Sequence, residues 1–543
     1  MIAEDPFTQS YVELLDGSYD VVDRIVLNGY FILGQTPGGF RTWWRRLHGG
    51  DDSKLDDAHL MRMAGRFSRR VRAWAEKNQI PVIDTTAGER KCDLAAELLP
   101  SKPNFLGIFA ILVGRAPAPI WEVQRYGNNG INLRRKSPKP WVNHYSFHII
   151  DKEWGHVVFK LCGHPPFSAQ IMLNGHEWVA CQARRQRLNF AKEDNCFTEV
   201  SSAPRLNQIA DALCSPSAIG RLEQVCERWI YTCLAFALNI HEQEQTGFRY
   251  NYSVYQLEFS RNLLFRRGSQ MDDVFDSVID RTRAPLQIKT VRKIFGKYRP
   301  RRKQHKRSEC AVVVERPQYD LTIFKVHYGR LTSKMYTKGE RVLRIEAIVH
   351  NTAEFRCGRS LPNFPRIVEH LRNILVRFLD VIHGLDSAFI DNGTLDSLPL
   401  PSIVGNSKIG GIDLNKLRMR AVFEAVMALS PSPRGFTSAA LAGSVQQITH
   451  QPYKPHQAAY DLKKLRSKQL VVRIAKSSRY QATPDGLRAI AALIILRDKV
   501  LRPVLAGAAR NALPQNDLTP IDRQYHLVHI HFRELLSLNG IAA

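Results

Sequence analysis

The sequence predicts an α+β protein of several domains, with a mixed α/β region first, a central body on an antiparallel sheet next and a small domain last. Three observations predict it. The chain has 543 residues, more than one ordinary core accommodates. Short apolar or alternating runs typical of strands are interspersed with segments of helical spacing. A stretch rich in Gly, Pro and Ser at residues 392–411 separates the last part from the rest.

The first 135 residues form the predicted mixed α/β region. Apolar runs predict strands at 24–32, 80–83, 105–113 and 121–124, and helical spacing predicts a helix at 59–78. Residues 136–391 form the predicted central body. Aromatic and β-branched residues predict a sheet at 141–173, helical spacing predicts helices at 206–236 and 367–382, and alternation predicts a strand at 252–265 that carries Glu258.

A predicted hairpin ends the sheet of the central body. Apolar residues alternate with Arg344 and Glu346 along 343–349, which is typical of a strand with one face in the core and one face outside. A turn at Gly339 would bring Tyr336 and its flanking Lys334 and Lys338 beside that polar face. A phenol, cations and a carboxylate on one face suit chemistry on a phosphate. The alternative is an ordinary hairpin with a solvated charged face.

A strongly basic segment precedes this hairpin. Nine of the sixteen residues at 292–307 are Lys or Arg, and they are interleaved with Phe295 and Tyr298. Such density does not pack in a core without counter-charges, so the segment is expected to contact phosphates, with a solvated loop as the alternative. The candidate nucleic-acid-binding residues here are Lys293, Lys297, Arg299, Arg301, Arg302, Lys303, Lys306 and Arg307.

The C-terminal domain is predicted at residues 412–505, after the 392–411 linker and before a tail at 506–543. Helices are expected at 415–429, 437–443 and 455–467, followed by strands at 470–474 and 480–482 and a last helix that begins at Pro484. This order resembles a winged-helix domain, and the resemblance implies that the third helix enters the major groove. The groups that would contact nucleic acid are Lys463, Lys464, Arg466 and Lys468 on that helix and Arg479 at the wing tip.

The overall charge favours a polyanionic partner. Lys and Arg number 77 against 51 Asp and Glu, and the first 100 residues hold 13 against 15, so the surplus lies in the rest of the chain. Nucleic acid is the expected partner, DNA first and RNA as the alternative, with an anionic membrane as the competitor. Because no long apolar run or signal peptide is found, we expect a cytoplasmic protein with no membrane partner. The nine cysteines lack a Cys-x-x-Cys pair, which argues against a zinc knuckle or disulfide framework.

Several short motifs resemble a family of uncharacterised, often multicopy bacterial proteins of mobile-element character that end in a winged helix. The matching segments are residues 23–26, 166–167 with 173–178, 194–197, 257–258 with 264–266, 334–338 with 343–346, and the C-terminal domain. The resemblance covers nearly the whole chain. It implies a mobile-element protein but no particular activity.

A narrower pattern runs from Gly329 through Tyr336 and Lys338 to Arg344 and Glu346, and it resembles the catalytic domain of rolling-circle replication initiators. The resemblance implies a tyrosine-dependent strand-nicking or strand-transfer endonuclease. Tyr336 would then be the nucleophile, and Lys338 and Arg344 would stabilise charge at the phosphate. Glu258 and Glu346 would hold Mg²⁺ or Mn²⁺.

The sequence departs from that pattern at Asn262 and Thr337, where acids are usual. The alternative function is therefore a non-enzymatic DNA- or RNA-binding protein, either a regulator or a ribonucleoprotein component, in which Tyr336 stacks or packs. His144 and His148 lie four residues apart in the predicted sheet, and a core or surface role is expected for each.

Overall fold

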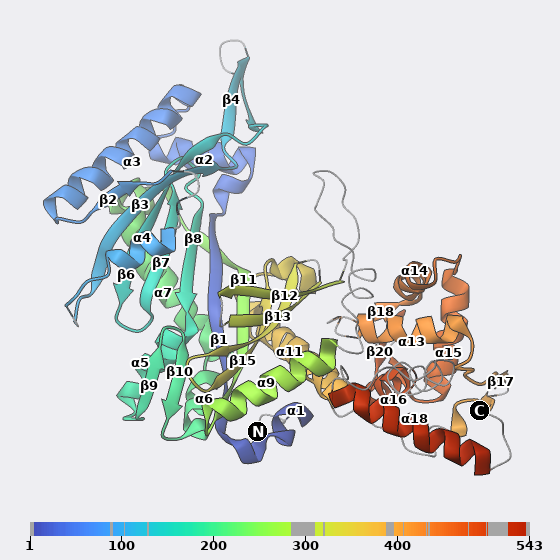
Figure 1. The fold of residues 1–543 in the computed structure, drawn as a ribbon. Helices are drawn as coiled ribbons and strands as arrows, with labels where there is room; N and C mark the ends of the chain where they lie inside the picture. Colours follow the sequence, from blue (N-terminus) through green and yellow to red (C-terminus); the bar gives the residue numbers. More distant parts are fainter. Residues whose placement is uncertain are drawn as a thin grey trace. The chain divides into compact units, whose positions relative to one another are not determined.

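The computed structural model describes residues 5–86, 89, 91–102, 104–126, 130–283, 310–318, 321–328, 330–386, 396–405, 407–430, 432, 435–475, 477–495, 497 and 520–538. They divide into two compact units. The sheet unit comprises Leu15–Gly268 and Arg330–Leu375, and the helical unit comprises Met1–Leu14, Ser269–Gly329 and Val376–Ala543. Both helices and a large sheet are present, which confirms the predicted α+β class (Figure 1).

A large mixed sheet forms the frame of the sheet unit. Its strands in spatial order are β14 (Leu331–Lys338), β15 (Val342–Val349), β11 (Tyr250–Phe265), β1 (Leu15–Phe31), β8 (Ala169–Asn174), β7 (Gly155–Cys162), β6 (Trp141–Asp151), β3 (Gly107–Pro117) and β2 (Val82–Asp84). Neighbours pair antiparallel except β2 and β3, which are parallel. The strands and the hairpin turn predicted from alternation are therefore present, with longer bounds at β1.

The predicted boundary at residue 135 does not separate two bodies. Strand β1 lies between β11 and β8, and β3 pairs with β6, so the first 135 residues and the central body build one sheet. The reason is that 17 mostly buried residues of β1 need partners on both edges, and the partners come from distant segments.

Aromatic side chains attach helices to this sheet. Phe67 of α3 (Asp57–Lys77) meets Tyr145 of β6 with ring centroids 4.7 Å apart, and Phe236, just after α7 (Ser217–Leu234), stacks on Phe147 at 6.0 Å. The remaining elements of this unit are α2 (Pro37–Leu47), α4 (Lys91–Glu97), β4 (Trp121–Tyr126), β5 (Gly130–Arg135), α5 (Gly175–Arg185), β9 (Phe190–Glu193), β10 (Cys196–Val200), α6 (Ala203–Asp211), α8 (Ile240–Thr246) and the first part of α11 (Phe364–Asp386).

Helix α5 begins in direct contact with β1. A Cβ atom at Gly175 would lie 1.7 Å from the Val22 carbonyl oxygen, so only glycine fits where this helix starts. The Asn174 side chain caps the helix by accepting from the His176 N–H at 2.9 Å. His176 is thereby fixed over the middle of the sheet.

The C-terminal part of the helical unit contains the elements expected between residues 412 and 505. They are α13 (Leu417–Leu429), β18 (Phe436–Thr437), α14 (Ser438–Thr449), α15 (Pro455–Ser467), β19 (Val471–Arg473), β20 (Arg479–Ala482) and α16 (Pro484–Ile495). The three strands form one small sheet in the order β18-β20-β19. Helix α15 has the predicted bounds, whereas α14 extends well beyond residue 443.

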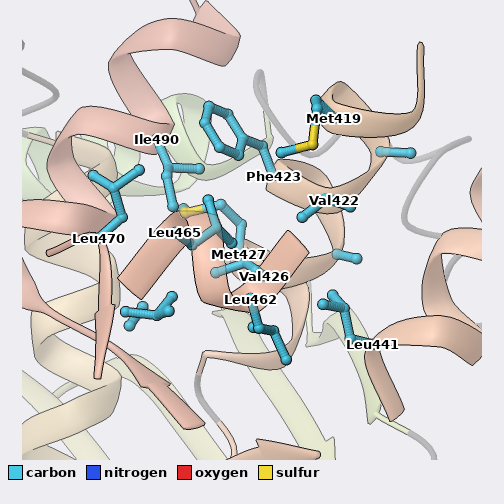
Figure 2. Packing of buried hydrophobic residues seen from close by; sticks show 14 of the residues in the cluster. Met419, Val422, Phe423, Val426, Met427, Leu441, Leu462, Leu465, Leu470 and Ile490 are labelled. Atoms are coloured by element: carbon cyan, nitrogen blue, oxygen red, sulfur yellow. The ribbon is translucent and has the colours of Figure 1, made fainter. Parts of the chain in front are cut away.

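One apolar core holds these helices together. Met419, Phe423 and Met427 of α13 belong to one buried apolar cluster with Leu441 of α14 and Leu465 of α15, all labelled in Figure 2. Each of these side chains is buried. The other elements of the unit are α1 (Pro6–Ser10), α9 (Gly268–Arg283), β12 (Cys310–Gln318), β13 (Leu321–Tyr328), β16 (Ser402–Val404), β17 (Ser407–Ile409) and α18 (Pro520–Leu538). Within the described ranges, no helix combines the length and apolar character needed to cross a membrane.

Candidate functional site

The residues predicted to be catalytic lie together on three neighbouring strands of the sheet unit. Tyr336 of β14 is paired with Arg344 of β15, and Lys334 is paired with Glu346. Ser260 of β11 is paired with Glu346 from the other side. Residues opposite one another in an antiparallel pair share a face, so one sheet face gathers the phenol, the cations and the carboxylate.

The Glu346 carboxylate is the centre of this cluster. Its Oε1 accepts from Tyr336 Oη at 2.6 Å and from Arg344 Nε at 2.7 Å, and its Oε2 accepts from Lys334 Nζ at 3.3 Å. Glu346 is 4% exposed. Since both oxygens have charged or hydroxyl donors, the buried carboxylate is satisfied.

Arg344 connects Glu346 to a second buried acid that the sequence analysis did not assign a role. Its Nη2 lies 2.5 Å from Asp23 Oδ2, and its Nη1 donates to the Asn195 carbonyl at 2.6 Å. His176 Nδ1 contacts the other oxygen of Asp23. Burial alone would raise the pKa of Asp23, but Arg344 and His176 hold this pKa well below its usual range. Asp23 is therefore ionised inside the protein.

This arrangement corrects the prediction for the strand at 343–349. Every residue of β15 is buried, and Arg344 is 0% exposed, so the strand has no solvent-facing side. The polar face is covered because Asp23, His176 and Asn195 from other segments supply partners for the guanidinium. The alternative of a solvated charged face is wrong for the same reason.

Tyr336 is half-buried and keeps its proton. Burial raises its pKa well above the ordinary tyrosine value, and the negative charge of Glu346 raises it further. The hydroxyl donates to Glu346, so the carboxylate is placed to take the proton if the phenol oxygen attacks an electrophile.

Glu258 lies on β11 beside this cluster. Burial raises its pKa to about 7, with further contributions from Glu346 and Asp23. Gln256 Nε2 donates to its Oε1 at 2.9 Å. Near neutral pH the carboxyl group is therefore divided between its two protonation states.

The acids at this site do not fit the Mg²⁺ or Mn²⁺ that the resemblance implies. Both oxygens of Glu346 already accept hydrogen bonds from Lys334, Arg344 and Tyr336, and the positive charges of Lys334 and Arg344 oppose a bound metal cation. Glu258 is half-protonated near pH 7, which weakens it as a ligand. Among the described residues, no three His, Cys, Asp or Glu side chains form a group that could hold a metal ion.

Lys338 contacts Asn195 at the edge of this cluster. Its Nζ donates to the Asn195 side chain in the turn between β9 and β10, and burial lowers its pKa, with a further contribution from Arg344. No role was predicted for Asn195, although residues 194–197 are one of the segments that carry the family resemblance. Asp23 had a visible signal, because it interrupts a run of apolar residues in β1.

The basic residues predicted on α15 divide into two sets. Lys463 and Arg466 are exposed, and with His456 and Tyr460 they form a stripe at helical spacing on one face of the helix. Lys464 Nζ instead lies 5.1 Å from the ring centroid of Tyr460, and Lys468 Nζ donates to the Ser397 carbonyl at 2.6 Å. We call His456, Tyr460, Lys463 and Arg466 the α15 stripe.

The predicted contacts of Arg479 and of the basic segment at 292–307 have different outcomes. The Arg479 guanidinium donates to the Gly435 carbonyl at 3.2 Å, so it supports the small sheet instead of extending from the wing tip. The basic residues Lys293, Lys297, Arg299, Arg301, Arg302, Lys303, Lys306 and Arg307 lie outside the described residues.

Comparisons with known proteins add no assignment. No protein-family model matches the sequence, and neither the search of curated proteins nor that of solved structures finds a match.

Proposed function

We propose that this chain binds nucleic acid through α15 of a winged-helix domain. The observation that supports the proposal most directly is the α15 stripe, which places Lys463 and Arg466 in solvent on the third helix. Helix, strand, two helices and two further strands follow one another as in helix-turn-helix domains with a wing. In such domains the third helix reads the major groove, and its cations contact phosphates or base edges.

The charge of the chain supports the same partner. The formal net charge is +26, and the first 100 residues carry none of the surplus. A field of this sign attracts polyanions and speeds their association. The resemblance to bacterial mobile-element proteins is consistent with DNA as the bound polymer.

Binding is tested by fluorescence anisotropy with labelled duplex DNA, single-stranded DNA and RNA over a range of salt concentrations. Lys463→Ala and Arg466→Ala are each expected to weaken binding and to lower the salt slope by about 1 per lost phosphate contact. Lys416→Ala is the matched control, because this lysine is 66% exposed on the same unit but lies before α13 and pairs with Asp413. Equal losses in all three variants, or no binding by the wild type, contradict the proposal.

A second candidate function is strand transfer at Tyr336. The specific observation that favours it is the 2.6 Å hydrogen bond from the phenol to Glu346, with Lys334 on the same carboxylate. The phenol oxygen would form a bond to phosphorus while its proton passes to Glu346. The bond from phosphorus to the 3′-oxygen would break, and that oxygen would take a proton from water, leaving a 5′-phosphotyrosine and a free 3′-hydroxyl. Lys334, which is 26% exposed and contacts Glu346, would meet the phosphate charge.

The two functions are separated by one substitution. Tyr336→Phe is expected to abolish a denaturation-resistant adduct with labelled single strands and to leave the anisotropy binding curve unchanged. The assay is run with EDTA and with Mg²⁺ or Mn²⁺, because the donor set argues for activity without the metal. If the wild type forms no adduct under any of these conditions, Tyr336 has a structural role and the binding function is unaffected.

A further inference from the structure

Two lysines and two histidines that take no part in the site around Glu346 lie on or beside β6 and β7 of the same sheet. Lys160 of β7 is paired with Ser146 of β6. His144 and His148 stand two residues to either side of Ser146, so the period of a strand places both on the face of Lys160. Lys91, the first residue of α4, completes the group.

Gly114 shows where the Lys91 ammonium lies. This glycine of β3 is paired with His144, and a Cβ atom on it would lie 2.6 Å from Lys91 Nζ and 2.8 Å from Thr85 Oγ1. The ammonium therefore occupies space over the sheet that a larger residue would take. We call Lys91, Lys160, His144 and His148 the cationic cluster.

The two lysines of the cationic cluster have no counter-ion. Within the described part of the chain, neither ammonium forms an ion pair or a hydrogen bond, although both side chains are half-buried. Burial lowers the pKa of both lysines, and Lys160 lowers that of Lys91 further. Glu177 raises the pKa of His156, the neighbour of His148, but this carboxylate itself accepts from Lys192 Nζ at 2.7 Å.

His148 adds an unsatisfied group. Its Nδ1 lies 3.1 Å from His156 Nε2, and its own Nε2 is buried with no hydrogen-bond partner among the described residues. The ring is 3% exposed. If His156 donates to Nδ1, then His148 Nε2 carries a proton and is a donor that lacks an acceptor. Buried donors without partners are rare, and a bound group is one explanation.

We infer that the cationic cluster binds a phosphate group. Two ammonium groups and an imidazole N–H supply donors to a tetrahedral oxyanion, whose several oxygens can accept from all of them at once. The anion would supply the negative counter-charge that the ammonium groups of Lys91 and Lys160 lack. Since these residues belong to the sheet unit, the inference does not depend on nucleic-acid binding through α15.

The test is isothermal titration of inorganic phosphate into the full-length chain at low ionic strength and pH 6. Binding is expected to occur at one site with uptake of protons, measured as a dependence of the heat on buffer ionisation. The reason is that burial and Lys160 keep the pKa of His144 at about 4, burial and His156 do the same for His148, and a nearby anion raises both.

Lysine variants connect the binding to these residues. Lys91→Met and Lys160→Met are each expected to weaken phosphate binding by roughly tenfold or more, because each removes a charged donor. Lys77→Met is the control, because this lysine lies exposed at the end of α3. Without phosphate, Lys160→Met is expected to raise the melting temperature by roughly 1–3 °C, because it removes an uncompensated half-buried charge.

The source of the phosphate is distinguished by two further titrations. Tighter binding of a 5′-mononucleotide than of inorganic phosphate identifies a nucleotide or strand terminus, and equal affinities identify free phosphate. Sulfate at the same ionic strength is expected to compete, whereas chloride is not. The inference is wrong if the wild type takes up no phosphate, or if both lysine variants bind phosphate as tightly as the wild type does.

Discussion

Two polar groups on the sheet unit differ in how their charges are compensated. Around Glu346 every buried charge has a partner, because Arg344 contacts both Glu346 and Asp23. In the cationic cluster Lys91 and Lys160 have none among the described residues. The first pattern supports the fold and holds Tyr336 in place, while the second leaves two half-buried ammonium groups without counter-charges, which a bound anion would supply. The difference teaches that missing counter-charges indicate a ligand better than the density of charge does.

The largest expected effect tests the compensated group. Arg344→Met leaves Asp23 and Glu346 buried without their shared cation and is expected to lower the free energy of unfolding by about 3–5 kcal/mol, measured by urea denaturation. Arg341→Met is the control, because its partners Asp16 and Glu199 are 50% and 65% exposed, and its loss is expected to stay below about 1 kcal/mol. Equal losses would mean that burial does not distinguish the two arginines.

Acid sensitivity tests the cationic cluster. The pKa of His148 is lowered to about 4, so the unfolded chain binds a proton there more readily than the folded protein does. Stability is expected to fall as the pH drops from about 6.5 to about 4. In phosphate-free buffer His148→Gln should remove about 1–2 kcal/mol of this loss, whereas the exposed His241→Gln should not. If His148→Gln loses as much stability on acidification as the wild type does, the ring is not held neutral by its surroundings.

Glu258 is expected to act with the opposite sign. Its pKa is raised to about 7, so the folded protein holds this proton more tightly than the unfolded chain. Stability therefore falls as the pH rises from about 4.3 towards 7 and is then constant. Glu258→Gln should reduce this decrease in the free energy of unfolding by about 1–2 kcal/mol after allowance for solvent screening. A steeper decline in the variant would contradict the assigned sign.

The smallest effect is expected from a glycine. Gly114→Ala places a methyl group against Lys91 Nζ and should weaken phosphate binding several-fold, with a stability change of less than about 1 kcal/mol because a lysine end can move. Gly220→Ala is the matched control, because the same addition in α7 meets nothing within 4 Å. Helix propensity should make that control slightly more stable, by about 0.5–1 kcal/mol. Phosphate affinity that is equal in both variants would place the anion elsewhere.

Local patterns predicted local structure well. The bounds of α15 were predicted to the residue, proline at the first turn predicted where α16 begins, and alternation predicted the hairpin of β14 and β15. Both signals arise from neighbours in sequence, which a single chain displays directly.

Long-range pairing was not predictable in the same way. The sequence could not show that β1 joins distant strands into one sheet, or that Asp23 would cover the polar face of β15. It also could not show which of the four predicted cations would form contacts within the protein. Lys468, for example, donates to the carbonyl of Ser397, which is distant in sequence. Alternation predicts which side of a strand is polar, but only the folded chain decides whether that side meets water.

The start of α5 has a consequence for how this protein can vary. Because Gly175 lies against the main chain of Val22, no side chain is tolerated there, whatever happens to the rest of the helix. His176 follows directly and contacts Asp23, which is connected to Tyr336 through Arg344 and Glu346. A mutation at position 175 would therefore disturb Tyr336 without contacting it. In an alignment of homologous sequences we would expect this glycine to be invariant while the positions around it vary.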